Sequence, residues 1–286
     1  MTPSTTARLL VACPDRPGII AATTAFVAEH GGNVVDLQQH TDHTDEAFFQ
    51  RVEFEVDDLD LGRDEVGPAF GPVADRFAMR WVLGWSDAVP RVGLLASKEP
   101  HCVHDLLHRW REGELNVDIG VLISNHPDHA DAADWFDVEH HHLPIVGGDK
   151  AGQEERVRQV LRRHRVDLVV LARYMQILSA GFCDEWSGRI INIHHSFLPS
   201  FQGARPYHQA HERGVKLIGV TAHYATAVLD DGPIIDQDVI RVSHRDDVDN
   251  LRRKGRDLEV VVLARAVRAH IEHRVLVYGR KTVVFD

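Results

Sequence analysis

Short apolar runs alternate with segments of helical periodicity along most of this chain, and this alternation constrains the fold more than any other feature. From Arg91 onward it predicts strands over residues 92–96, 117–124, 142–146, 168–172 and 190–194. Helices are predicted between them, over 101–111, 131–137, 151–164 and 179–186. This order predicts a doubly wound, mostly parallel, Rossmann-like α/β sheet. Strands over 216–224 and 234–242, a helix over 247–273 and a hairpin (275–278 and 282–285) complete this part.

The first 84 residues follow a different pattern. Strands are predicted over 7–14, 34–40, 48–56 and 78–84, with helices over 19–30 and 62–76. Gly31-Gly32 ends the first helix, as expected of a helix C-terminus. The resulting βαββαβ order is that of a ferredoxin-like sandwich. We therefore expect a first domain over 1–84, a linker over 85–90 and a second domain over 91–286.

Composition excludes several classes of partner. The 286 residues suit two domains, or one large one, with ample length for buried cores. The chain has 43 Asp and Glu residues and 32 Lys and Arg residues, which gives a net charge of −11. This negative charge argues against binding of nucleic acid or of an anionic membrane surface. No run of eighteen apolar residues predicts a membrane span, and the N-terminus lacks a secretory pattern. Cys13, Cys102 and Cys183 are widely spaced, which fits free thiols in a reducing cytoplasm.

Twenty histidines invite a metal hypothesis. The run His140–His142 is a poor ligand set, because adjacent side chains on an extended segment point in opposite directions. His126 and His129 have a helical spacing, but Pro127 interrupts the helix that would align them. We predict no metal site.

Polar side chains suited to catalysis lie at the end of one predicted strand. Asn192 and His194 lie two residues apart, so on a strand both side chains point to the same face. Phe197-Leu198-Pro199 ends that strand, and open α/β sheets bind ligands at such carboxyl ends. Asp230 lies in a Gly-Pro turn that can return a carboxylate to the imidazole. Amide, imidazole and carboxylate together indicate acyl transfer from a carbonyl.

The same residues resemble the signature of the folate-dependent formyltransferase family. The matching stretches are Asn192-Ile193-His194, Ser196–Pro199 and Leu229–Pro233, with GARPYHQA at 203–210 and GVTAHY at 219–224. The resemblance extends from about Arg91 to the C-terminus. It implies a formyltransferase-type fold with 10-formyltetrahydrofolate as substrate, and no prosthetic group.

In three features the chain resembles the deformylase members of this family, which pass the formyl group to water. An ACT-like domain precedes the catalytic one. The segment Ser97–Cys102 lacks the glycine-rich phosphate loop of the glycinamide ribonucleotide transferases. The variants around 194–196 and 203–210 also resemble the hydrolase. The implied role is to balance folate pools and supply formate for purine biosynthesis. A transferase acting on a small amine and a non-catalytic folate or amino-acid sensor stay open as alternatives.

The resemblance also implies site roles. Asn192 would donate to the formyl oxygen, His194 would move protons, and Asp230 would orient the imidazole or the water. For His195, structural support and catalysis both stay open. The residues expected to bind the folate are Met175, Gln176, Ile177, Leu178, Ser196, Gly203 and His208.

The turn after the first strand resembles that of ACT domains, which often pair with themselves and often bind amino acids. It implies an amino-acid effector and a homo-oligomer, either dimer or tetramer. Dimerisation without an effector stays open. The residues expected to bind the effector are Asp15, Arg16, Pro17, Gly18, Ile19 and Asn33.

Overall fold

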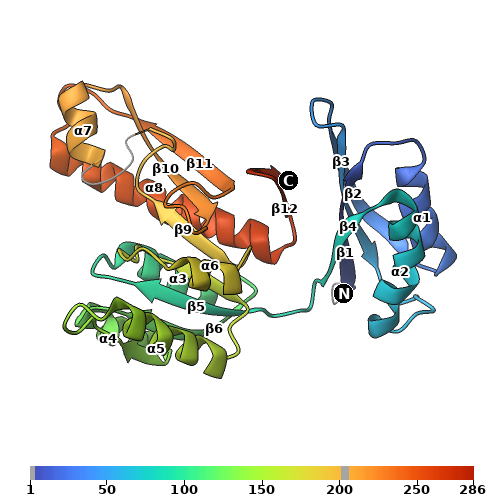
Figure 1. Cartoon of the computed structure of the whole chain (residues 1–286), viewed down its shortest axis with the longest axis horizontal. Coiled ribbons are helices and arrows are strands. Elements are labelled where there is room, and N and C mark those ends of the chain that lie inside the picture. Colours follow the sequence, from blue (N-terminus) through green and yellow to red (C-terminus); the bar gives the residue numbers. More distant parts are fainter. Residues whose placement is uncertain (1–3, 201–205) are drawn as a thin grey trace. The chain divides into compact units, whose positions relative to one another are not determined.

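The computed structural model describes residues 4–200 and 206–286, and its contacts divide the chain into two units (Figure 1). The first unit runs to Ala88 and also contains Glu272–Tyr278 and Thr282–Asp286. The second unit contains Val89–Ile271 and Gly279–Lys281. The division after Ala88 lies inside the linker predicted over 85–90.

The N-terminal part of the first unit has the βαββαβ order that the sequence predicts. Its elements are β1 (Thr6–Pro14), α1 (Ile19–Glu29), β2 (Asn33–Asp42), β3 (Ala47–Glu55), α2 (Arg63–Phe77) and β4 (Arg80–Trp85). The four strands form one antiparallel sheet in the order β2-β3-β1-β4 within the described residues. Both helices cover the same face of this sheet (Figure 1).

Side chains along β1 point alternately to the two faces of the sheet, and this explains why both faces are covered. Leu9 and Val11 point toward the helices and pack with Phe26 and Phe70 in one core. Leu10 and Ala12 point to the opposite face, where they belong to a second cluster. Period-two alternation therefore places apolar side chains on both sides of the sheet.

A C-terminal hairpin covers the second face and corrects the predicted domain boundary. Its strands are β12 (Val275–Tyr278) and β13 (Lys281–Val284). Leu276 and Phe285 pack with Leu10 and Phe49, and the rings of Phe49 and Tyr278 lie 4.4 Å apart. The prediction placed this hairpin in a domain over 91–286, whereas its contacts place it largely in the first unit. The physical reason is the apolar second face, which needs cover.

The second unit contains one seven-stranded sheet among the residues described, in the order β11-β10-β9-β8-β5-β6-β7. The five strands from β9 to β7 are parallel, and β10 runs antiparallel to both β9 and β11. The mostly parallel sheet is therefore confirmed. The strands are β5 (Arg91–Ala96), β6 (Asp118–Ser124), β7 (His140–His142), β8 (Leu168–Leu171), β9 (Ile190–His194), β10 (Leu217–Tyr224) and β11 (Ile234–Arg241).

Helices cover both faces of this sheet. Val157 and Leu161 of α5 and Phe182 of α6 pack in one core with side chains of the parallel strands. On the other face α8 contacts α3, β9, β10 and β11. The helices are α3 (His101–Arg111), η1 (Pro127–His129), α4 (Ala130–Phe136), α5 (Lys150–Arg163), α6 (Ala180–Glu185), α7 (Pro206–Arg213) and α8 (Val248–Ile271).

One predicted strand is displaced. A strand was expected over 142–146, but β7 covers His140–His142 and pairs with Leu122–Ser124 of β6. Pro144 has no N–H with which to extend the ladder, so pairing ends just after the last backbone bond, from Leu143 N to Ser124 O. The apolar run that follows His142 misled the prediction.

The chain reverses its direction across the sheet between β5 and β8, and this is where an open α/β sheet offers a ligand crevice. In the described parts of the chain, no helix combines the length and apolarity needed to cross a bilayer.

Phe49→Ala tests the second core of the first unit. The ring is 1% exposed and contacts Tyr278, so its removal should lower the free energy of unfolding by about 3–5 kcal/mol. Val35→Ala, at a side chain 49% exposed, should cost less than about 1 kcal/mol. Urea denaturation of both variants measures the difference. Equal losses would show that the hairpin does not bury this face.

Candidate active site

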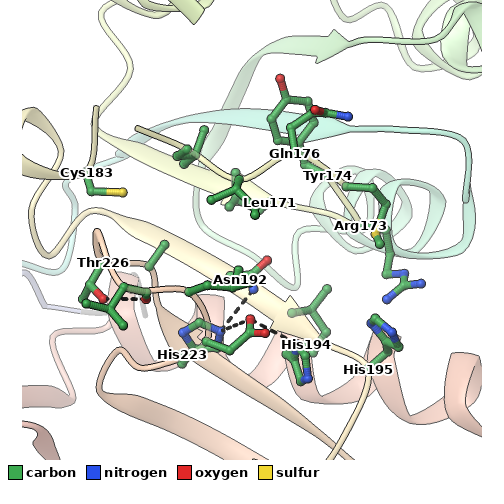
Figure 2. Close-up of a pocket in the computed structure, with 18 residues that line it drawn as sticks. Leu171, Arg173, Tyr174, Gln176, Cys183, Asn192, His194, His195, His223 and Thr226 are labelled. Carbon is green, nitrogen blue, oxygen red and sulfur yellow. Dashed lines mark hydrogen bonds and ion pairs between the residues drawn. The ribbon is translucent and has the colours of Figure 1, made fainter. Parts of the chain in front are cut away.

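A cavity of about 320 Å³ lies at the carboxyl ends of β8 and β9 (Figure 2). The three predicted catalytic residues, Asn192, His194 and Asp230, all line it. Four predicted folate-binding residues, Met175, Gln176, Ile177 and Leu178, line it as well. We call it the folate cavity, after the ligand that the sequence leads us to expect there.

A neighbouring strand fixes the orientation of Asn192. His223 of β10 lies directly opposite Asn192 across the antiparallel pair β9–β10. Burial lowers the pKa of His223, so its ring is neutral, and its Nδ1–H donates to the carbonyl oxygen of Tyr224 at 3.0 Å. Its Nε2 must therefore accept, and it lies 3.1 Å from Asn192 Nδ2. The amide keeps a second N–H for a ligand.

Both ring nitrogens of His194 face an acceptor. Nδ1 lies 3.2 Å from Asp230 Oδ1, and Nε2 lies 2.8 Å from Ser196 Oγ. The Ser196 hydroxyl donates to the carbonyl oxygen of Ser200 at 2.9 Å, so it can only accept from the ring. An imidazole protonated on both nitrogens can donate to both of these acceptors.

Asp230 is the carboxylate that faces His194, and its side chain is 9% exposed. Burial acts to raise the pKa of Asp230, but the hydrogen bond from His194 and the charge of His194 outweigh it. The net pKa lies below the ordinary value, so Asp230 is ionised at neutral pH.

Close backbone packing brings Asp230 to His194. A bulge between Ala222 and His223 shifts the register of β10 against β11, just before the loop that carries Asp230. Asp230 itself has a left-handed backbone, with φ of 55°. A Cβ at Gly232 would lie 1.7 Å from the carbonyl oxygen of Tyr224, so only glycine fits there. The loop thus depends on Gly232.

The segment after β8 forms the apolar wall of the folate cavity. Met175 and Ile177 are 55% and 54% exposed, so they present apolar surface to the cavity that they line. Ser97, just after β5, anchors the segment: its Oγ accepts from Met175 N at 2.9 Å and donates to Asn125 Oδ1 at 2.7 Å. Two strand ends therefore shape this wall.

A second cavity of about 150 Å³ adjoins the first and shares Arg173 and His195 with it. We call it the charged cavity. Glu259 of α8 is 1% exposed there and accepts hydrogen bonds from His101 Nε2 at 2.7 Å and Tyr207 Oη at 3.0 Å. Its other residues are Glu99, His208, Arg252 and Arg256.

Burial acts to raise the pKa of Glu259, but the hydrogen bond from His101 and the charge of Arg173 outweigh it and lower the net value. Arg173 Nε lies 3.3 Å from Glu259 Oε2. Glu259 is therefore an ionised carboxylate already surrounded by donors.

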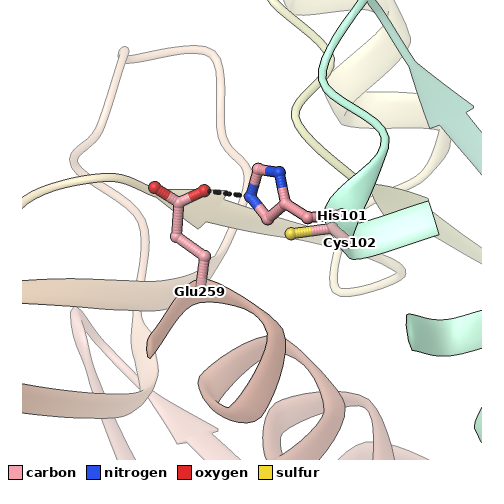
Figure 3. Close-up of side chains that lie close together, drawn as sticks. All are labelled: His101, Cys102 and Glu259. Carbon is pink, nitrogen blue, oxygen red and sulfur yellow. Dashed lines mark hydrogen bonds and ion pairs between the residues drawn. The ribbon is translucent and has the colours of Figure 1, made fainter. Parts of the chain in front are cut away.

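Among the residues that the structure describes, two groups of side chains have a composition suited to a metal ion. The atoms of His101, Cys102 and Glu259 lie within 4.8 Å of one another (Figure 3). Burial and the nearby Glu259 charge raise the pKa of the Cys102 thiol well above its ordinary value, so the thiol is protonated. Within this first group His101 Nε2 and Glu259 Oε2 are hydrogen-bonded at 2.7 Å. The second group is Glu139, His141 and His164.

The remaining predicted folate residues are distributed differently. Ser196 supports His194 from behind the cavity wall. His208 lines the charged cavity instead of the folate cavity. Gly203 lies outside the described residues.

Sequence reasoning missed His223, Arg173 and Glu259. Each is a polar residue at the end of, or within, an apolar run, as in LEVVVL around Glu259. A lone charged residue on an apolar helix face was the available signal, because such residues are rarely buried without partners.

The structure does not bring the predicted effector residues together within one chain. Asp15, Arg16, Pro17 and Gly18 form an exposed turn, followed by buried Ile19. Asn33 pairs with Glu55 at one end of β3 and donates to its Oε2 at 2.8 Å. The turn adjoins the other end of β3, at Ala47. At 3.4 Å per residue these ends lie about 27 Å apart, because α1 carries the chain back along the sheet.

Comparison with known proteins agrees with this architecture. Residues 90–267 match the formyl transferase family model, and residues 7–65 match the ACT domain model. The formyltetrahydrofolate deformylase of Synechocystis sp. is 54% identical over 98% of both chains.

Solved structures show the same likeness. The crystal structure of a formyltetrahydrofolate deformylase from Pseudomonas syringae has a TM-score of 0.97 at 50% identity, and covers 100% of this chain and 96% of that one. A glycinamide ribonucleotide transformylase from Symbiobacterium toebii has a TM-score of 0.67 at 32% identity, covering 69% of this chain and 95% of that one.

The full-length identity to deformylases, together with the match to both domain models, decides between these relatives. The chain belongs to the formyltetrahydrofolate deformylase family.

Proposed function

We propose that this protein hydrolyses 10-formyltetrahydrofolate to formate and tetrahydrofolate. The observation that carries the proposal is that Asn192, His194 and Asp230 lie together on the wall of one cavity, with His194 paired to Asp230. The set supplies an amide donor, a protonated imidazole and a carboxylate, as acyl transfer requires. The chain that holds it is related over its full length to deformylases.

In the proposed reaction, water attacks the formyl carbon and the bond from that carbon to N10 breaks. Asn192 donates its free N–H to the formyl oxygen, where negative charge develops. His194 adds positive charge beside the formyl group and gives its Nε2 proton, which Ser196 otherwise accepts, to the departing N10. Asp230 keeps His194 charged and correctly oriented. Of the two water protons, one is recovered on N10 in the net reaction and the other is released with formate.

We place the pterin of the substrate against the segment from Arg173 to Leu178. Exposed Met175 and Ile177 supply apolar area, and the backbone of the segment, held by Ser97, supplies fixed polar groups. A cavity of about 320 Å³ suits part of a folate, with the rest of the ligand extending outward.

Water is the acceptor that the full-length relation to deformylases and the absence of a glycine-rich phosphate loop support. Glu99 lies where the sequence lacks a glycine-rich phosphate loop, and it pairs with Arg256 at 2.9 Å. Glu259 adds a second, buried carboxylate.

The wider setting is part of the same proposal. We place the enzyme in the cytoplasm, since Cys13, Cys102 and Cys183 are free, buried thiols. There it would balance one-carbon folate pools and supply formate for purine biosynthesis. We further propose a homo-oligomer, dimer or tetramer, whose ACT domain binds an amino acid that adjusts turnover. No prosthetic group enters the proposed chemistry.

Asn192→Ala and Asp230→Asn test the proposed chemistry. Each should lower kcat by about 10²–10³, because each removes a group that stabilises the developing charge. Formate and tetrahydrofolate are measured together, without an added amine. Asp231→Asn is the matched control, since this neighbouring carboxylate pairs with Arg280 instead. A folded Asp230→Asn variant with near wild-type turnover would refute the assignment.

Gly232→Ala tests the loop that carries Asp230. The added methyl meets the backbone of Tyr224, so the loop must move and turnover should fall at least about tenfold. Gly71→Ala is the control, because a Cβ there meets nothing within 4 Å and alanine favours a helix. Unchanged turnover in Gly232→Ala would mean that Asp230 needs no fixed position.

Calorimetry with the twenty common amino acids tests the effector. We expect heat from at least one of them and a change of turnover at the same concentration. Arg16→Ala, in the exposed turn, should weaken this binding. Absence of both heat and a rate change with every amino acid would leave the ACT domain with a purely structural role.

A further inference from the structure

His195 lies at the boundary between the folate cavity and the charged cavity and lines both. Figure 2 shows its ring beside the guanidinium of Arg173, which also lines both. The ring packs against His194 and Tyr207, with centroid separations of 5.1 and 6.1 Å. His195 is thus held in place by its neighbours.

Hydrogen bonding distinguishes His195 from the other two histidines of the folate cavity. His194 and His223 each use both ring nitrogens within the protein. The ring nitrogens of His195 make no hydrogen bond to any residue in 4–200 or 206–286. In the part of the cavity wall that the structure describes, His195 is the imidazole left open to a ligand.

The ring of His195 is neutral at neutral pH. Burial lowers its pKa to about 4, and the positive charges of Arg173 and His194 act in the same direction. A neutral imidazole has one N–H and one lone pair, so it can accept a hydrogen bond from water.

The charged cavity has both the room and the polarity for water. Its volume of about 150 Å³ exceeds the roughly 30 Å³ that one water occupies in the liquid. Charged or polar side chains form its wall, and a buried water needs two to four such partners.

We propose that the charged cavity holds the water that attacks the formyl group, and that His195 orients this water at the boundary of the folate cavity. The proposal rests on the proposed hydrolysis and names the residue that supplies its second substrate. The lone pair of the ring accepts from the water, whose oxygen then faces the formyl carbon.

The step balances as follows. As the water oxygen bonds to the formyl carbon, one water proton is transferred to the lone pair of His195 and from there to solvent in the charged cavity. N10 takes a proton from His194 as the carbon–nitrogen bond breaks. Formic acid returns its hydroxyl proton to His194 and leaves as formate. Tetrahydrofolate, formate and one proton are the products.

The experiment compares two nucleophiles on the wild type, His195→Ala and His195→Gln. Each protein is saturated with 10-formyltetrahydrofolate, and formate is measured with and without added hydroxylamine, which gives formohydroxamate. After subtraction of the uncatalysed reaction, His195→Ala should lose about 10² in kcat for hydrolysis, with KM changed less than about twofold. Hydroxylamine needs no positioned water, so the ratio of formohydroxamate to formate should rise at least tenfold.

The glutamine variant should recover part of the hydrolysis, because its amide oxygen can also accept from water. It keeps the test valid if the alanine variant does not fold. His104→Ala, at an exposed histidine of α3 outside both cavities, should match the wild type. An unchanged product ratio in the folded variants overturns this proposal alone. Absence of formate from the wild type overturns the proposed hydrolysis and this proposal together.

Discussion

The ion pair between His194 and Asp230 is the interaction on which the rest of the site depends. Both side chains are more than nine-tenths buried, and removal of two charges from water is costly unless each is fully satisfied. Here the Ser196 hydroxyl lies 2.8 Å from the other ring nitrogen of His194 and satisfies the far side of the ring. The pair forms because the antiparallel strand β10 and its bulge return the chain to the end of β9.

The buried carboxylate of Glu259 holds together the wall of the charged cavity. Glu259 ties α8 to α3 through His101, to α7 through Tyr207 and to the segment after β8 through Arg173. Arg173 has a left-handed backbone, with φ of 63°, which a non-glycine residue adopts at some cost in free energy. The strained Arg173 and the buried Glu259 stabilise each other. Together they keep a polar cavity open beside an apolar one.

In the first unit the four-stranded sheet has two apolar faces, and the C-terminal hairpin covers one of them. Without the hairpin, Leu10 and Phe49 on this face would be exposed to water. Because the exposed turn at 15–18 and Asn33 adjoin opposite ends of β3, a ligand that touches both needs more than one chain. The proposed oligomer and the proposed effector site are therefore physically linked.

Local pattern alone determined the two βα architectures and the positions of Asn192, His194 and Asp230, because strand periodicity and turn chemistry depend on near neighbours. Tertiary structure decided what surrounds them. His223 meets Asn192 only through strand pairing, and Glu259 reaches Arg173 only through the packing of α8. The hairpin's place in the first unit and the separation of Asn33 from the effector turn also depend on contacts between residues far apart in the chain. Sequence periodicity contains no information about such distances.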